Sequence, residues 1–266
     1  MFRTSFEGSR PRLDWRAVAL LAGGLLFVYY LVPILALLTA QNPLSVLRQF
    51  ESAAVVTAAT HSVLTALAST GVATAFGVPL AYLLARSSFR GKWLVTTVLV
   101  LPLVLPPIVS GILLLRVFGP NALGGPAAAL GVPLTRSLVG VVLAQTFVAS
   151  PFVVLTAKAA FEGVDAELEA ASRTLGKDAV TTMRRVTLPL ARPGILAGVT
   201  LAFARSMGEF GATIMLAYYP RTMPVQIWVS YLSTGLDAAL PIAVVLLVLS
   251  LVVLLALTVA GTNPWG

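Results

Sequence analysis

The chain has 266 residues, of which 58% are hydrophobic and only 11% charged, and its mean hydropathy is +0.94. A soluble domain carries about 25% charged residues, so this composition excludes a soluble enzyme, a soluble nucleic-acid-binding protein and a disordered chain. The formal charge is +8, from 18 basic and 10 acidic side chains. In a membrane protein, an excess of Lys and Arg collects in the cytoplasmic loops. The positive charge therefore indicates the orientation of the chain in the membrane and is not a sign of a nucleic-acid partner.

Six apolar segments are long enough to cross about 30 Å of hydrocarbon as helices. In chain order they cover residues 17–39, 62–85, 93–115, 137–157, 193–217 and 239–260. An open sheet is excluded, because its unpaired backbone groups would face lipid. The sequence therefore predicts an all-α integral membrane protein with six transmembrane helices, built as a single transmembrane domain over residues 1–266.

The basic residues predict the orientation of the chain. Arg3, Arg10, Arg12 and Arg16 precede the first apolar segment, which is too long for a signal peptide and is followed by no convincing cleavage site. Most of the other Lys and Arg residues follow the second and fourth segments. The positive-inside rule then places both termini in the cytoplasm and the chain in the cell membrane.

The scarcity of metal-binding and nucleophilic residues argues against catalysis. The chain has no cysteine and a single histidine, His61. A thiolate or histidine-rich metal centre is therefore excluded, and a membrane enzyme would lack its usual cluster of titratable groups. We expect no metal and no cofactor.

The predicted cytoplasmic loop at about residues 158–192 holds over a third of the charged residues and has internal order. Val164, Leu168, Ala171 and Leu175 recur at helical spacing, which predicts an amphipathic helix. Glu169 lies off this stripe, where it can pair with Arg173 four residues later or reach a basic residue of a partner.

Gly176 is suited to end this helix in a left-handed conformation. A second short helix is predicted from Asp178, a good N-cap, to Val186, with Pro189 and Pro193 stopping it before the next span. Periodicity alone leaves two interpretations open: a solvated amphipathic hairpin, or a helix–Gly–helix element that docks into a groove on a partner.

The residue pattern of this loop resembles the EAA loop of ABC-importer permeases. The matching positions are Glu169, Ala170, Ala171, Arg173, Leu175, Gly176, Val186, Leu188 and Pro189, where Val186 replaces the commoner Ile. The resemblance implies the type I ABC importer permease fold, with a loop that couples to ATPase subunits. It further implies a homodimer, two copies of an ABC ATPase and an extracytoplasmic oxyanion-binding protein as partners. The chain has no G-x-x-x-x-G-K-[ST] phosphate loop, so ATP hydrolysis would belong to the partner.

Three further runs are similar to molybdate, tungstate and sulfate permeases. They are LPLVLPPIVSG at residues 101–111, AQTFVASPF at 144–152 and FARSMGEFGAT at 203–213. The run LAYYPRTMP at 216–224 looks most like molybdate/tungstate permeases. The resemblance thus implies molybdate or tungstate as the transported oxyanion, with sulfate or thiosulfate as the alternative.

Several polar, proline and glycine residues inside the spans are candidates for the pathway or for helix packing. The prolines predict a kink in the third span, and the hydroxyl and amide groups can offer weak hydrogen bonds to a hydrated oxyanion. Arg205 and Glu209, four residues apart, predict an intramembrane ion pair, which has either a functional or a purely structural role. The candidates are Pro102, Pro106, Pro107, Ser110, Gln145, Ser150, Arg205, Glu209, Gly211 and Thr213.

An ATP-independent channel or ion-coupled carrier is the alternative from another class. That interpretation predicts several intramembrane acids or an inverted repeat of broken helices. The sequence has neither pattern.

Overall fold

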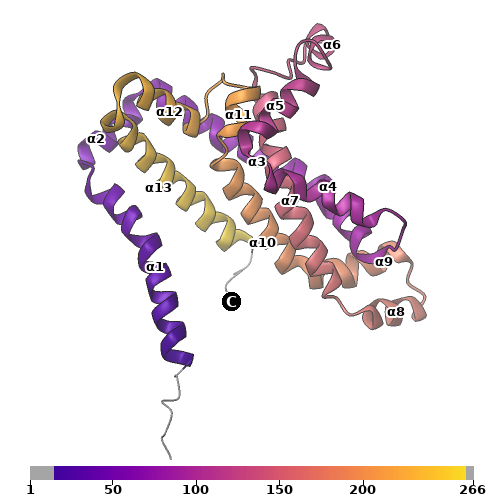
Figure 1. Cartoon of the computed structure of the whole chain (residues 1–266). Helices are drawn as coiled ribbons and strands as arrows, with labels where there is room; N and C mark the ends of the chain where they lie inside the picture. Colours follow the sequence, from indigo (N-terminus) through magenta and orange to yellow (C-terminus); the bar gives the residue numbers. More distant parts are fainter. Residues whose placement is uncertain (1–14, 262–266) are drawn as a thin grey trace, which may run out of the picture.

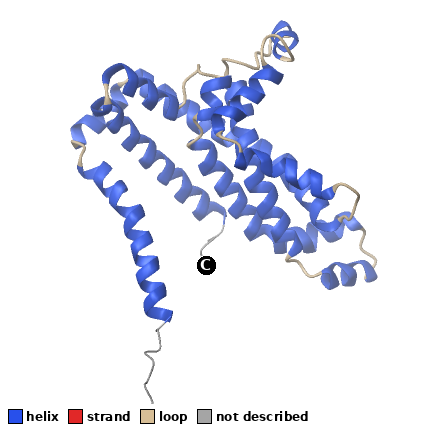
Figure 2. Cartoon of the chain, in the orientation of Figure 1, coloured by secondary structure: helices blue, strands red, loops and turns tan. Residues whose placement is uncertain are grey.

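The computed structural model describes residues 15–261, and every regular element in that range is helical (Figures 1 and 2). The elements are α1 (Trp15–Thr39), α2 (Pro43–Leu47), the 3-10 turn η1 (Arg48–Glu51), α3 (Ala53–Arg86), α4 (Lys92–Val104), α5 (Pro107–Phe118), α6 (Gly124–Ala129), α7 (Leu138–Glu162), α8 (Ala166–Thr174), α9 (Ala179–Thr182), the π-helix η2 (Met183–Thr187), α10 (Leu188–Met207), α11 (Gly211–Leu216), α12 (Met223–Thr234) and α13 (Leu236–Gly261). The all-α membrane fold is confirmed: five helices are long and apolar enough to cross a membrane, or six if the bent pair α4–α5 counts as one span. Arg3, Arg10 and Arg12 lie outside the described residues.

Helices α3, α7 and α10 pack against one another at the centre of the bundle. Their contact buries Leu84, Phe161 and Ile195 in one apolar cluster. Glycines let α10 approach α7 closely, since a Cβ at Gly194 would lie 2.6 Å from the Cβ of Ala160 and one at Gly198 would collide with Thr156. This is the close approach that small residues four apart permit in membrane bundles.

Helix α1 stands apart from this bundle (Figure 1). None of its residues is buried, and large apolar side chains such as Leu20 and Phe27 are exposed. Its few neighbours lie on α13. The surface of α1 is therefore free for lipid or for another protein chain.

The third apolar segment is more strongly bent than the sequence suggested. A single kinked span was predicted over residues 93–115, but the chain forms two helices, α4 and α5, bent by 117°. Leu105 and Pro106 between them have extended backbones, with ψ angles of 136° and 134°. A residue before proline is pushed out of the helical region, and two successive prolines apply that restriction twice.

The fifth segment also departs from its predicted bounds of 193–217. The helix begins before the span, because α9, η2 and α10 run on as one helical segment from Ala179 to Met207 that is long and apolar enough to cross a membrane. Pro189 and Pro193 therefore do not stop the second loop helix as predicted. The wider turns of η2 precede Pro189, and such a local adjustment accommodates the ring and the missing donor.

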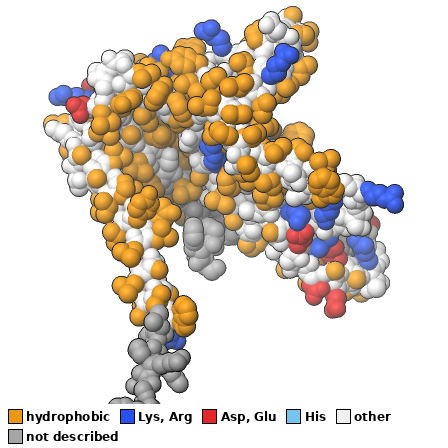
Figure 3. All heavy atoms as spheres, viewed as in Figure 1, with side chains coloured by type: hydrophobic (Ala, Val, Ile, Leu, Met, Phe, Trp, Pro, Cys, Tyr) orange, Lys and Arg blue, Asp and Glu red, His pale blue; other side chains and the backbone are white. Residues whose placement is uncertain are grey.

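The predicted span is also broken at its far end, because α10 ends at Met207 and α11 starts at Gly211. Two short helices outside the predicted spans, α6 and α12, lie with α11 toward one end of the molecule (Figure 1). Helices α8 and α9 lie at the opposite end, where Lys, Arg, Asp and Glu side chains gather (Figure 3). The two ends of the bundle thus differ in charge and in structure.

Candidate functional site

The loop between α7 and α10 forms the predicted helix–Gly–helix element. Asp165 caps α8 by accepting a hydrogen bond of 2.9 Å from the backbone N–H of Glu167. At the other end the Gly176 and Lys177 N–H groups donate to the carbonyls of Arg173 and Ser172. Gly176 has a φ of +77°, so the predicted left-handed turn is confirmed.

The second helix is shorter than predicted. Asp178 is its N-cap, as expected, and accepts a hydrogen bond of 2.8 Å from the N–H of Thr181. The hydrogen bonds from Thr181 lower the pKa of Asp178 below its usual value. Helix α9 ends at Thr182, where the chain widens into η2 instead of continuing as an α-helix to Val186. A contact of 3.0 Å between the Ser172 and Thr182 hydroxyls ties the two loop helices together.

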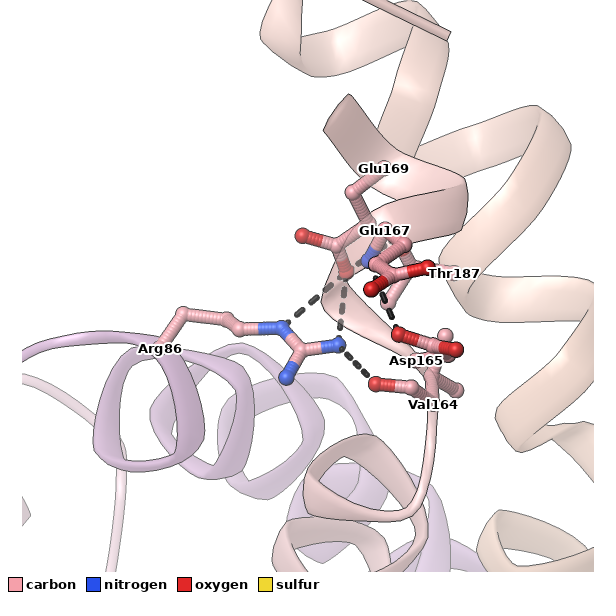
Figure 4. Close-up of polar contacts among 6 residues, drawn as sticks. All are labelled: Arg86, Val164, Asp165, Glu167, Glu169 and Thr187. Atoms are coloured by element: carbon pink, nitrogen blue, oxygen red, sulfur yellow. Dashed lines mark hydrogen bonds and ion pairs between the residues drawn. The ribbon is translucent and has the colours of Figure 1, made fainter. Parts of the chain in front are cut away.

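Glu169 anchors the loop to the membrane bundle (Figure 4). Its Oε1 accepts hydrogen bonds from Nε and Nη2 of Arg86, at 3.0 and 2.7 Å, and from the Thr187 hydroxyl at 2.8 Å. Arg86, the last residue of α3, also donates to the Val164 carbonyl at 3.0 Å. The Glu169 side chain is only 8% exposed. One carboxylate thereby joins α8, α3 and the start of the α10 span.

Two details of the predicted loop are therefore wrong. No ion pair joins Glu169 to Arg173 among the described residues, because Arg86 and Thr187 occupy the carboxylate. The predicted apolar stripe is also divided. Val164 is buried in the bundle core, whereas Leu168 and Leu175 point away from it and are exposed.

The exposed part of the loop includes apolar side chains among the charged ones. Leu175 is 79% exposed, and Leu168 and Val180 are each about half exposed. Ala170, Ala171 and Arg173 are also exposed. Of the other positions of the loop pattern, Val186 is half-buried, while Leu188 and Pro189 are exposed at the start of α10. This surface, defined by Leu168, Ala171, Leu175 and Val180, is hereafter the loop face.

Gly176 carries a specific conformational demand. A Cβ at this position would meet no atom within 4 Å, so there is room for a side chain. The obstacle is the positive φ angle, which residues with a Cβ rarely adopt. A left-handed conformation costs an L-residue about 1–2 kcal/mol, and more for a β-branched one. We expect Gly176→Val to raise hydrogen exchange in α8, and Gly176→Asn, which tolerates this conformation, to leave it nearly unchanged. Equal exchange in the Val variant and the wild type would show that the turn does not hold α8.

The residues predicted for the pathway or for helix packing lie at several helix contacts. Gln145 is buried and donates from Nε2 to the Ser206 carbonyl at 3.0 Å, while Ser69 donates to the Ser206 hydroxyl at 3.0 Å. These bonds tie α3, α7 and α10 together. Ser110 and Thr213 are buried, and their hydroxyls have no hydrogen-bond partner among the described residues. Of the other candidates, Ser150 is half-buried, Pro102 is buried, and Pro106 and Pro107 are exposed.

Gly211 is a packing position in this structure. A Cβ there would lie 2.7 Å from the Cβ of Pro107 and 3.0 Å from the Ile108 nitrogen. On the facing helix, a Cβ at Gly111 would lie 2.7 Å from the Cβ of Met215. Helices α5 and α11 thus approach so closely that larger residues would separate them.

The predicted ion pair between Arg205 and Glu209 is formed. Arg205 Nη1 lies 2.6 Å from Glu209 Oε2, and the Glu209 side chain is 1% exposed. The other carboxylate oxygen accepts a hydrogen bond of 2.7 Å from the N–H of Ala212. Glu209 therefore supports the first turn of α11, which explains why a new helix starts beyond Gly208.

Sequence reasoning missed Arg86 and Thr187 as parts of the loop site. Arg86 directly follows the second predicted span, among the basic residues that predict the orientation, and Thr187 directly precedes Leu188 and Pro189 of the loop pattern. A usable signal was present: Arg86 ends a span on the same predicted side of the membrane as the acidic loop. Nothing in the local spacing identified which acid it contacts, 83 residues away.

Known proteins resemble this chain over most of its length. A probable molybdenum ABC transporter permease protein of Haloferax volcanii is 62% identical over 94% of the chain and 92% of that protein. The molybdate/tungstate transport system permease protein WtpB of Pyrococcus abyssi is 37% identical over 86% of the chain and 88% of its own length. In fold, the chain is similar to a solved bacterial alginate ABC transporter, with a TM-score of 0.69, 18% identity and coverage of 92% of this chain and 93% of that one. The family model described as "Binding-protein-dependent transport system inner membrane component" matches residues 77–261, and the chain belongs to this family.

Proposed function

We propose that the chain is the membrane-spanning subunit of an ATP-driven importer and forms the path for molybdate or tungstate. The observation that carries the substrate is the high identity, over nearly the whole chain, to a permease named for molybdenum. The permeases named for molybdate and tungstate support the same class of cargo. On this proposal residues 1–266 act as one transmembrane domain, and selectivity resides chiefly in a separate extracytoplasmic binding protein.

We infer that the loop face docks on a separate ATPase subunit. The loop face exposes two leucines and a valine to solvent. Exposed apolar patches of this kind mark sites of protein contact. The loop is held rigidly by the contacts of Glu169 with α3 and η2. A rigid link of this kind transmits a displacement of α8 to the spans.

The proposed transporter contains two copies of the chain and two ATPase subunits. The apolar surface of α1 is uncovered within one copy and is available to a second copy or to lipid. The chain itself has no phosphate loop. Hydrolysis of ATP is therefore assigned to the partner.

The cargo is tested by uptake into vesicles that contain the complete complex. We expect uptake of molybdate or tungstate that requires both ATP and the binding protein, and no ATP hydrolysis by the purified chain alone. Uptake of sulfate without molybdate would replace the cargo by the alternative oxyanion. Uptake that continues without ATP would instead favour a channel or an ion-coupled carrier.

The orientation of the chain is tested with tags at residues 1 and 266. Most Lys and Arg residues lie on the side of the α8–α9 loop in the predicted topology, so we expect both tags to be cytoplasmic. The measurement is protease accessibility in intact cells and in inverted vesicles. An external tag at either end would contradict a six-span arrangement.

A further inference from the structure

A pocket of about 280 Å³ lies at the end of the bundle opposite the loop face. It is formed by the first turns of α3, by the segment that follows α11 and by the start of α12. Its lining residues are Ala53, Ala54, Thr57, Ala58, His61, Tyr219, Arg221 and Gln226. The lining contains an arginine and a histidine but no acidic residue.

Arg221 brings a positive charge to this pocket and is only partly paired within the protein. Its Nη1 donates to Gln226 Oε1 at 3.3 Å, and the guanidinium lies 5.8 Å from the centre of the Tyr218 ring. Its Nε is buried and has no hydrogen-bond partner among the described residues. A buried donor left unpaired costs free energy, so the pairing of this guanidinium within the described residues is incomplete.

The backbone that carries Arg221 is fixed against α3. The Arg221 carbonyl lies 3.2 Å from Nδ1 of His61, and the Met223 N–H donates to the Ser62 hydroxyl at 2.8 Å. If Nδ1 of His61 donates to that carbonyl, the other ring nitrogen remains for a second partner. The pocket is therefore held in shape before any ligand arrives.

The start of α3 adds a further attraction for anions. Ala53 and Ala54 belong to the first turn of this 34-residue helix, and the N-cap residue Ser52 makes no side-chain capping bond. The first N–H groups of a helix lack partners within the helix, and their partial positive charge favours an anion. The nearest acidic residues along the chain and in the adjoining pocket, Glu51 and Asp237, do not line this one.

We propose that this pocket binds a tetrahedral oxyanion at the end of the bundle where cargo enters. The proposal rests on the proposed function for the identity of that oxyanion and for which end is external. Arg221 supplies positive charge, and the start of α3 supplies partial positive charge. The volume is large compared with the roughly 30 Å³ that a water molecule occupies, so a partly hydrated oxyanion fits. Such a site holds cargo released by the binding protein before the path opens.

The test is equilibrium binding of radiolabelled molybdate to the permease–ATPase complex in nanodiscs, without the binding protein. Thr57→Glu places a carboxylate in the pocket without removing any hydrogen bond of Arg221. Thr60→Glu is the matched control, since Thr60 is exposed on the same helix and does not line the pocket. We expect saturable binding that Thr57→Glu weakens at least tenfold and Thr60→Glu leaves unchanged.

Variants of Arg221 provide a second comparison. Arg221→Gln should weaken binding at least tenfold, and Arg221→Lys, which keeps the charge, should weaken it less. Arg48→Gln is the control for loss of one positive charge, because Arg48 lines the adjoining pocket together with Asp237. Absence of saturable binding to the wild type, or equal binding by the Thr57→Glu and Thr60→Glu variants, would overturn the proposal.

The same preparation separates this proposal from the proposed function. A complex that imports molybdate with ATP and the binding protein, but has no site sensitive to Thr57→Glu, contradicts only the pocket. A complex that does not import molybdate, but binds sulfate at a site sensitive to Thr57→Glu, retains the oxyanion pocket and contradicts the proposed cargo.

Discussion

Replacing Arg86 by Met is expected to uncouple the α8–α9 loop from the membrane bundle. The change leaves the Glu169 carboxylate in a buried position, and the Thr187 hydroxyl is then its remaining side-chain donor among the described residues. Removing one partner of a buried ion pair costs about 3–5 kcal/mol, because the other charge stays uncompensated. Membrane insertion should survive, since Arg86 is the last residue of α3 and the apolar part of that span is unchanged.

The measurements are copurification of the ATPase and the ATP hydrolysed per molybdate imported. We expect Arg86→Met to lower copurification strongly or to raise hydrolysis without transport. The double variant Arg86→Met with Glu169→Met should be less defective than Arg86→Met alone, because it leaves no buried charge. If Arg86→Met couples normally, the contact of Glu169 with α3 is not the link between the loop and the spans.

The ion pair between Arg86 and Glu169 shows what the sequence can and cannot predict. Some features of the loop depend only on residues that are close in sequence: its two helices, their N-caps Asp165 and Asp178, and the left-handed turn at Gly176. Local spacing was therefore enough to predict the turn and the cap at Asp178. The partner of Glu169 depends on how α3 and α8 pack, which local spacing does not encode. The nearby Arg173 was therefore a reasonable expectation, and tertiary packing overrode it.

The breaks in the spans also combine features that local sequence predicts with features that depend on tertiary packing. Pro106 and Pro107 marked the position of the bend between α4 and α5, but not its 117° angle. That angle accompanies the close packing of α5 on α11, where Gly111 and Gly211 remove the side chains that would keep the helices apart. The break after Gly208 had no proline to mark it. It coincides with the hydrogen bond from the Ala212 N–H, in the first turn of α11, to Glu209, a contact that the spacing to Arg205 did not suggest.

Replacing Arg205 by Met is expected to destabilise the whole bundle. Glu209 would remain fully buried, with the Ala212 N–H as its one remaining partner among the described residues. The expected loss is again about 3–5 kcal/mol of folding free energy, now inside the membrane bundle. Glu209→Gln should be milder, at about 1–3 kcal/mol, because the amide oxygen can still accept from Ala212.

The exposed pair Lys158–Glu162 is the matched control, since it has the same four-residue spacing and a distance of 2.7 Å. Its Glu162 side chain is 43% exposed, so Lys158→Met should change stability by no more than about 1 kcal/mol. The measurements are thermal unfolding of the purified permease followed by size-exclusion chromatography, and molybdate uptake. The double variant Arg205→Met with Glu209→Gln should be more stable than Arg205→Met alone, because the second change removes the unpaired charge. Equal losses for Arg205→Met and Lys158→Met would mean that Glu209 is hydrated in the membrane and that the pair does not determine where α11 begins.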